Sequence, residues 1–425
     1  MDYSFSSDQR AAYQAFGDLL ADKLPLDDLL AAPSASAAMS SAAEDSTAGQ
    51  HSAGQHSAAQ QSAGQHSAAQ HSAETALLRL MAADGWLELL CPAEADWQPG
   101  DLVGAVHVLE QLGRIPTSNL TLHLIGFVLP LVRALAPDQL PAVIALIEAG
   151  KLVSAAVPDQ TAAGQFRYSA AIDQNTGAII APVPASRTPV VIAADRVDAV
   201  IVPVRSGDGT WSLGLIEPGD QARRTDAHRL DLSAPADPLT VLTPGQLPRP
   251  LPGGPHLGTG TDLGTGTGTG LAEQEFQAGI DKAMRYYLLS LGAQAVGGGA
   301  ELTRRTVEYV SQRKQFGRPI ASFQALRHIV ADMALLVENS RAMLYETAWR
   351  VAGRPADSGD YVAAARVYTA GSYVKVAESA IQCFGGIGFT WEGGVHAWYR
   401  NALANTYYLS DVHLASQLLE HQLAS

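Results

Sequence analysis

The stretch "QRKQFGRPIASFQALRHIVADM" (residues 312–333) joins a basic, aromatic turn to the start of a long helix. Apolar residues recur after the turn at the three- and four-residue spacing of one helical face. They are Phe323, Leu326, Val330, Met333, Val337 and Leu344. We therefore expect a long amphipathic helix here. The rest of the sequence has to explain why Arg313, Phe316 and Gly317 stand in that order directly before it.

Composition narrows the classes of protein. The chain has 425 residues and a formal net charge of −14. That length can bury a large core and predicts two or three domains. The acidic balance argues against nucleic-acid binding, because no surplus of basic side chains is available for phosphates. With only Cys91 and Cys383, a disulfide framework is not expected, which indicates a reducing compartment.

The start of the chain, "MDYSFSSDQRAAYQAFGDLLADKL", lacks a basic region followed by an apolar run, so it does not resemble a signal peptide. No stretch approaches twenty uninterrupted apolar residues. We therefore expect a cytoplasmic protein without a membrane span.

A five-residue unit repeats through residues 48–72 and places His51, His56, His66 and His71 in one segment. Imidazole side chains can bind metals, so metal binding is one interpretation. The favoured one is a disordered insertion at about residues 34–75, because the tract lacks the large apolar residues that would offset its ordering entropy. No metal site is predicted.

Residues 258–270 read "GTGTDLGTGTGTG" and contain glycine spacings like those of dinucleotide-binding loops. Such a motif is informative only between a strand and a helix. Here it follows the Pro-rich "PGQLPRPLPGGP", so residues 246–271 are predicted to be a flexible linker.

These tracts divide the chain into blocks. Residues 1–150 show helical spacing on both sides of the insertion. Residues 151–245 contain short β-branched runs bounded by Gly, Pro and Asp, such as "DAVIVPV" and "WSLGLIE", with "SGDGT" between them as a hairpin turn. Residues 272–425 are helical again. The order is helical, β, helical, an α+β fold.

With this order in place, the chain resembles the acyl-CoA dehydrogenase family. The strongest matches are "VEYVSQRKQFGRPIASFQALRHIVADM" and, further on, "AIQCFGGIGFTWEGGVHAWYRNA"; "GWLELLCPAE" adds a looser one. The resemblance implies an all-α N-terminal domain, a middle β domain and a C-terminal four-helix bundle. It also implies FAD, held between the β domain and the bundle and reaching across a subunit interface.

On the family pattern, Arg313 neutralises the FAD pyrophosphate, for which a guanidinium fork is suited. Gln315 supplies a polar contact, Phe316 an apolar face, and Gln324 a contact to the adenosine portion. Gly317 permits the turn.

Three residues of "QCFGGIGF" match the family's other cofactor-contacting loop: Gln382, Gly385 and Gly386. Paired glycines there let the backbone approach a nucleotide closely. Read singly, each of these residues is more often an ordinary surface, core or helix-terminating residue; the joint pattern favours a flavin site.

In members of this family, a glutamate abstracts the α proton of an acyl thioester while the β hydride passes to the flavin. Ungapped matching puts Leu409 and Tyr287 at the two positions where members carry that glutamate, and neither is a carboxylate. The "GFTWE" segment resembles a subgroup found in bacterial sterol and side-chain degradation, whose aspartate matches Asp411. Asp411 is therefore the candidate base; a helix N-cap is an equally good interpretation. In the β block, Pro158 is the one trace of the family's flavin-ring motifs.

Three hypotheses follow. The chain is a FAD-dependent dehydrogenase that desaturates an acyl-CoA or acyl-carrier thioester and passes electrons to an acceptor like electron-transfer flavoprotein. Alternatively, it is a non-catalytic subunit of a hetero-oligomer, lending cofactor residues to a partner's FAD. The third is a flavin-free binding or assembly protein on this scaffold. The resemblance implies a homo- or hetero-oligomer in the first two.

Overall fold

The computed structural model of the protein describes part of the chain. The described residues are 7–23, 72, 74–91, 99–116, 119–160, 166–168, 171–173, 179–180, 190–192, 197–216, 239–241, 249–250, 270–353, 358–390, 393–407, 412, 416 and 419. The four histidines of the repeat tract, the glycine tract before Gly270, Leu409 and Asp411 lie outside them.

The N-terminal part is built of helices that bury their apolar faces against each other and against the C-terminal helices. Their bounds are α1 Ser7–Lys23, a helix over 74–83, α5 Trp86–Leu89, α6 Pro99–Gly113, α7 Asn119–His123, η2 Leu124–Val128, α8 Leu129–Leu135, η3 Pro137–Gln139 and α9 Leu140–Glu148. The helical spacing predicted at the start of the chain is confirmed, since Phe16 and Leu20 of α1 are buried. The ring of Phe16 packs on that of Trp86 at 4.9 Å.

The middle part is a mixed sheet with the strand order β10-β8-β7-β1-β6-β9, and β4 with β5 beside β7. Its strands are β1 Val153–Val157, β4 Ala171–Asp173, β5 Ile179–Ile180, β6 Val190–Ile192, β7 Ala199–Arg205, β8 Trp211–Ile216, β9 Leu239–Val241 and β10 Arg249–Pro250. A separate pair joins β2 Asp159–Gln160 to β3 Phe166–Arg167. The short strand β10 extends this sheet from within the Pro-rich stretch expected to be linker.

The predicted hairpin between the two longest strands is confirmed. β7 and β8 pair antiparallel with Arg205 opposite Trp211. Gly209 takes a φ of +88°, and the Asp208 carboxylate accepts hydrogen bonds from the amide and hydroxyl of Thr210. A left-handed glycine next to an Asp that bonds its own turn is the residue pattern such a turn requires.

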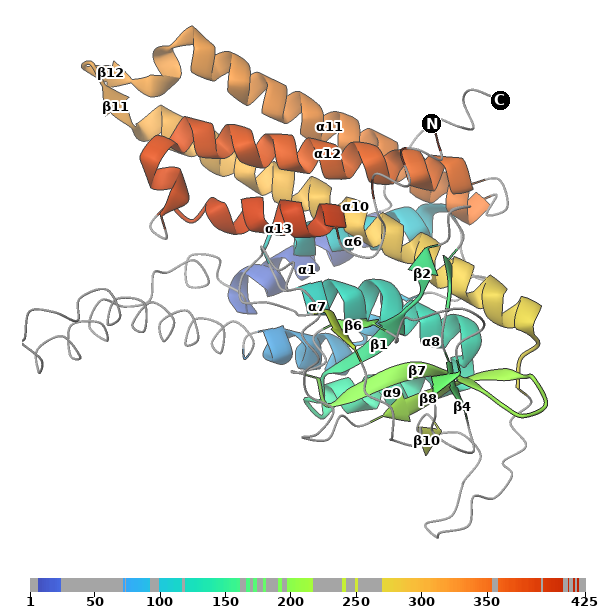
Figure 1. Cartoon of the computed structure of the whole chain (residues 1–425). Helices are drawn as coiled ribbons and strands as arrows, with labels where there is room; N and C mark the ends of the chain where they lie inside the picture. The colour runs from blue at the N-terminus through green and yellow to red at the C-terminus, as the bar shows by residue number, and fades with distance from the viewer. Residues whose placement is uncertain are drawn as a thin grey trace, which may run out of the picture.

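Four helices form the C-terminal bundle: α10 Glu273–Gln312, α11 Gln324–Gly353, α12 Gly359–Phe384 and α13 His396–Tyr407. Figure 1 shows the first three lying side by side along their length, with a small hairpin beyond the ends of α10 and α11. The apolar face predicted for α11 is confirmed, since Met333, Val337 and Leu344 are buried. The predicted order of a helical, a β and a second helical block is therefore observed. No helix among the described residues is long and apolar enough to cross a membrane.

The N-terminal helices and the bundle touch backbone to backbone where α6 crosses α10. A Cβ atom added at Gly297 of α10 would lie 2.0 Å from the carbonyl oxygen of Glu110. One added at Gly113 of α6 would lie 2.6 Å from the Cα of Gln294. Only glycine permits so close a crossing, so these two residues fix the distance between the two parts of the chain.

Candidate functional site

The turn quoted at the outset forms a hairpin at the far end of the bundle (Figure 1). Strands β11 (Lys314–Gln315) and β12 (Arg318–Pro319) pair with Gln315 opposite Arg318, which leaves two residues in the loop. Both have positive φ, 54° for Phe316 and 77° for Gly317. This is the geometry of a type I′ turn, whose first position normally holds Asn, Asp or Gly. A phenylalanine there is conformationally unfavourable.

Phe316 gains little from the fold in return. Its side chain is 90% exposed, and its ring meets that of Phe323 only edge-on at 6.2 Å. The guanidinium of Arg318 lies over the Phe323 ring, 4.3 Å from its centroid, so Phe323 is held in place without any contribution from Phe316. The described residues give no structural explanation for a strained and exposed aromatic side chain, which makes Phe316 a candidate for contact with a ligand or another chain.

The second predicted segment forms a turn at the end of α12. Gly385 ends that helix with a φ of +65°, and the five residues Gly385–Phe389 form the 3-10 turn η6. A Cβ added at Gly386 would meet nothing within 4 Å, and Phe389 is 72% exposed. In this glycine turn (residues 385–389), the backbone at Gly385 and Gly386 is therefore open to close approach by a ligand.

An aromatic stack joins the two segments. The rings of Tyr309, in the last turn of α10, and Phe384, the last residue of α12, lie 4.1 Å apart and nearly parallel at 11°. The Tyr309 hydroxyl also donates to the Phe384 carbonyl at 3.4 Å. Neither residue was predicted from the sequence, although Tyr309 lies four positions before Arg313 and Phe384 lies within the segment "QCFGGIGF".

The structure thus gathers the predicted cofactor residues at one end of the bundle, and it exposes them. Arg313 is the extended residue that ends α10, Gln324 is the first residue of α11, and Gln382 lies in the last turn of α12. All three are exposed, as are Gln315 and Gly386. We call the β11–β12 hairpin, the first residue of α11 and the glycine turn the bundle tip.

Tyr287, which stands at one of the two expected base positions, lies elsewhere and is buried in α10. Its ring packs on His123 at 5.8 Å and on Phe127 at 5.7 Å. His123 and Phe127 come from α7 and from the π-helical turn η2, which contacts both β1 and α10. The three rings therefore fill the described part of the junction between the N-terminal helices, the sheet and the bundle.

His123 is held neutral at this junction. Burial lowers the pKa of His123 to about 3, and the nearby backbone of Ala155 in β1 opposes this only in part. Neither ring nitrogen makes a well-formed hydrogen bond to the residues that the structure describes. A π-helical turn beside a buried imidazole is a combination often found at functional sites. Here, however, the side chains leave the ring fully covered.

The remaining predicted residues give less information. Asp411 and Leu409 lie outside the described residues, so the candidate base stays a prediction. Pro158 is buried directly after β1.

Comparison with known proteins gives the class. Residues 280–409 match the family described as acyl-CoA dehydrogenase, C-terminal domain. A probable acyl-CoA dehydrogenase, FadE25, of Mycobacterium tuberculosis is 36% identical over 119 residues, which are 28% of this chain and 31% of that protein. The chain thus matches about a third of this relative's length.

Solved structures of the same fold cover the whole chain. Butyryl-CoA dehydrogenase from Megasphaera elsdenii superposes with a TM-score of 0.66 at 16% identity, over 100% of both chains. The ChsE4–ChsE5 complex from Mycobacterium tuberculosis gives 0.63 at 18% identity, over 100% of this chain and 99% of that one.

The C-terminal helices thus form an acyl-CoA dehydrogenase C-terminal domain, and the whole chain has the acyl-CoA dehydrogenase fold. The resemblance of the C-terminal part to this family and the predicted fold class are both confirmed.

Proposed function

We propose that this chain is a subunit of a FAD-dependent acyl-CoA dehydrogenase complex, and that its bundle tip completes a FAD site lying mainly on another subunit. The observation that carries the proposal is the exposure of the tip. The predicted cofactor residues share one end of the bundle, where the described part of the chain leaves them exposed. A nucleotide bound there needs a second surface to cover it.

The side chains of the tip suit the nucleotide end of FAD. The exposed guanidinium of Arg313 can pair bidentately with the pyrophosphate. Phe316 offers an aromatic face, and Gln315 and Gln324 offer neutral polar contacts. The open backbone of the glycine turn can approach the nucleotide closely. A solved structure of the same fold, PigA, is described with FAD.

The described residues of the junction around Tyr287 include no carboxylate base, so they give no support for proton abstraction by this chain. When bound, FAD accepts the hydride from the β carbon of an acyl thioester, and a base must take the α proton. Tyr287 stands at a position where family members carry that base, but it is a phenol covered by Phe127 and His123. We infer that the base and the acyl site belong to the partner subunit. The ChsE4–ChsE5 complex is a two-protein assembly of the same fold.

A second candidate is that the chain is itself the dehydrogenase, with Asp411 as the base. A carboxylate near a flavin can serve this role because burial raises its pKa. In either case the substrate is an acyl-CoA or acyl-carrier thioester and the electron acceptor is a flavoprotein. One solved structure with this fold comes from work on the electron-transferring flavoprotein of Acidaminococcus fermentans. We expect the complex to be cytoplasmic.

Purification of the chain alone and with a co-expressed acyl-CoA dehydrogenase chain tests these proposals. A colourless protein that gains the flavin absorption bands only in the complex supports the subunit role. A yellow isolated chain that reduces a dye with acyl-CoA contradicts it and supports the second candidate. In that case Asp411→Asn should abolish turnover, and an unchanged rate would remove Asp411 as the base. A colourless protein in every combination leaves the flavin-free scaffold.

A further inference from the structure

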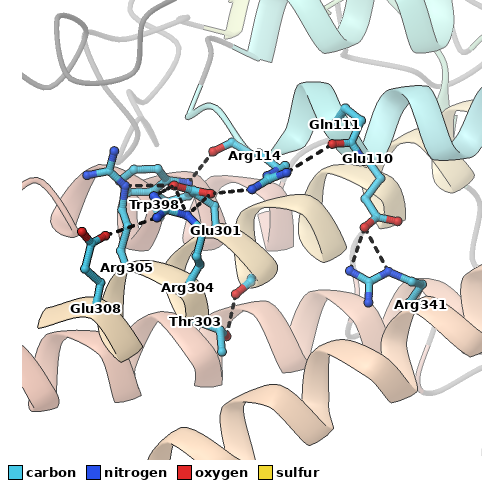
Figure 2. A network of polar contacts seen from close by, with 11 residues as sticks. Glu110, Gln111, Arg114, Glu301, Thr303, Arg304, Arg305, Glu308, Arg341 and Trp398 are labelled. Atoms are coloured by element: carbon cyan, nitrogen blue, oxygen red, sulfur yellow. Dashed lines mark hydrogen bonds and ion pairs between the residues drawn. The ribbon is translucent and has the colours of Figure 1, made fainter. Parts of the chain in front are cut away.

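A closed cycle of contacts lies on the bundle next to the tip. The carboxylate of Glu301, on α10, is buried and accepts hydrogen bonds from Arg114 at 3.0 Å and Arg305 at 3.1 Å. The half-exposed Arg304 adds three more hydrogen bonds. Figure 2 shows these guanidinium groups converging on the one carboxylate from α10 and from the end of α6.

Trp398 closes the cycle from α13. Its indole N–H donates to the carbonyl oxygen of Arg114 at 3.1 Å, and the guanidinium of Arg305 lies over its ring, 5.2 Å from the centroid. The contacts therefore run from Glu301 to Arg114, on to Trp398, through Arg305 and back to Glu301 (Figure 2). Trp398 is fully buried, so its indole has no freedom to take another position.

The segment held by Trp398 is joined closely to the glycine turn. Trp398 is the third residue of α13, and Gly393 lies just before that helix. A Cβ added at Gly393 would lie 2.1 Å from the carbonyl oxygen of Ile387, a residue of the glycine turn. The Thr390 hydroxyl donates to that same carbonyl at 2.9 Å. The start of α13 and the glycine turn are thus in direct contact.

We propose that Glu301, Arg305 and Trp398 are positioning residues that hold the glycine turn in place for the nucleotide. Their described contacts form the cycle, and Trp398 passes its position on to the turn through the backbone of residues 393–396. The inference rests on the proposed function, because it takes FAD as the ligand of the tip. It adds residues that the family pattern in the sequence did not single out.

The charge state of Glu301 favours this role. Burial alone would raise the pKa of Glu301, but hydrogen bonds from Arg304 and Arg114 and their charges lower it below its usual value. The carboxylate is therefore ionised at neutral pH and accepts several charge-assisted bonds at once, which are stronger than neutral ones. A glutamine at 301 would keep the shape but could not attract three guanidinium groups equally.

The other half of the network in Figure 2 supplies a matched control. Arg341 of α11 pairs with the buried Glu110 at 2.8 Å, as Figure 2 shows. It also pairs with the exposed Glu338. Among the described residues, the partner of Glu338 is Arg341, on the side of α11 that faces Glu110. Glu338→Gln therefore removes the same charge from a nearby ion pair without touching the proposed cycle.

The test uses the full chain with Trp398→Phe, Glu301→Gln or Glu338→Gln. Hydrogen–deuterium exchange measures the amides of residues 385–395, and FAD titration of the co-purified complex measures affinity. Trp398→Phe should speed exchange in that peptide about five- to tenfold, the equivalent of one lost hydrogen bond. The FAD Kd should rise by a similar factor. Glu301→Gln should act in the same direction, while Glu338→Gln should leave both unchanged.

Each other result overturns the inference. Unchanged exchange at 385–395 would show that the cycle does not hold the turn. Faster exchange throughout the bundle, with a matching fall in Tm, would make Trp398 an ordinary packing residue. Faster local exchange with an unaltered FAD Kd would separate the turn from the nucleotide. A wild-type complex that takes up no FAD would instead be a failure of the proposed function, and the inference would fall with it.

Discussion

The bundle tip and the junction around Tyr287 differ in how they use aromatic side chains. At the junction, His123, Phe127 and Tyr287 are covered and pack ring to ring. At the tip, Phe316 and Phe389 stand almost free of the rest of the chain. The junction thus buries its aromatic side chains in the core, whereas the bundle tip exposes them on the surface.

That difference separates stability from assembly. Covered aromatic rings contribute to the free energy of unfolding, whereas exposed ones contribute only when something else covers them. Substitutions at the junction and at the helix crossing beneath it should therefore destabilise the chain. Substitutions of exposed side chains at the tip should leave the stability of the chain unchanged and lower the affinity for a ligand bound there.

The largest effect is expected at the crossing of α6 and α10. Gly297→Ala would drive a methyl group into the backbone of Glu110 and should reduce the free energy of unfolding by about 3 kcal/mol, because neither helix can give way cheaply. Urea denaturation measures this. Gly371→Ala in α12, where a Cβ meets nothing within 4 Å, is the control and should be neutral or slightly stabilising. Equal effects at both sites would contradict the crossing geometry.

The pH dependence of stability tests the buried state of His123. Its pKa of about 3 lies below the usual 6.5, so the unfolded chain binds more protons below pH 6.5 and stability falls as the pH drops from 6.5 towards 3. At pH 5 this loss is about 2 kcal/mol relative to pH 7.5.

His123→Phe should remove that share of the acid loss, measured by urea denaturation at both pH values. His328→Gln, at an exposed site on α11, serves as the comparison and should retain it. An unaltered pH profile in His123→Phe would mean that the imidazole is not kept neutral in the fold.

At the tip, Phe316→Ala should leave Tm unchanged and raise the FAD Kd of the complex about tenfold, the loss expected for one aromatic stacking contact. Thermal unfolding and FAD titration give the two numbers. Leu335→Ala removes an exposed apolar side chain from α11 away from the hairpin and should change neither. A fall in Tm without a change in affinity would assign Phe316 to the fold instead.

The smallest effect concerns the stack that joins the two halves of the tip. Tyr309→Leu and Phe384→Leu, singly and together, should reveal a coupling of about 1 kcal/mol in the free energy of unfolding, as expected for a paired aromatic contact. A double-mutant cycle by urea denaturation measures it. Additive single effects would show that the rings do not support one another.

Much of the fold was readable because local patterns agreed with the tertiary structure. The apolar spacing from Leu326 to Leu344 predicted the buried face of α11, and "SGDGT" predicted the turn after Arg205. Both depend on residues close together in the chain. The segment at Arg249 was expected to be linker on its proline content, but two of its residues pair with β8. Proline tolerates such an edge position, which composition alone does not reveal.

The site was readable only in part. The order of Arg313, Phe316 and Gly317 indicated a ligand-binding turn, and the motif grouped it with Gly385. Long-range contacts gave no such signal. The approach of Trp398 to Arg114 joins residues 284 positions apart, and the burial of Tyr287 depends on a π-helical turn that no local pattern marks. Residues that hold a site in place through contacts distant in sequence can be identified only from the three-dimensional structure.

The left-handed backbone at Phe316 has a consequence for the order of events in assembly. Glycine would adopt this turn freely, whereas a phenylalanine there costs about 1–2 kcal/mol. The turn nonetheless closes with its neighbour Gly317 and with the β11–β12 pairing, before any contact from outside. A ligand or second chain that bound here would therefore meet a backbone turn that is already formed, and little backbone entropy would be lost in ordering it. Binding at this end of the molecule would then require little rearrangement of the backbone, because the unfavourable turn conformation is already adopted on folding.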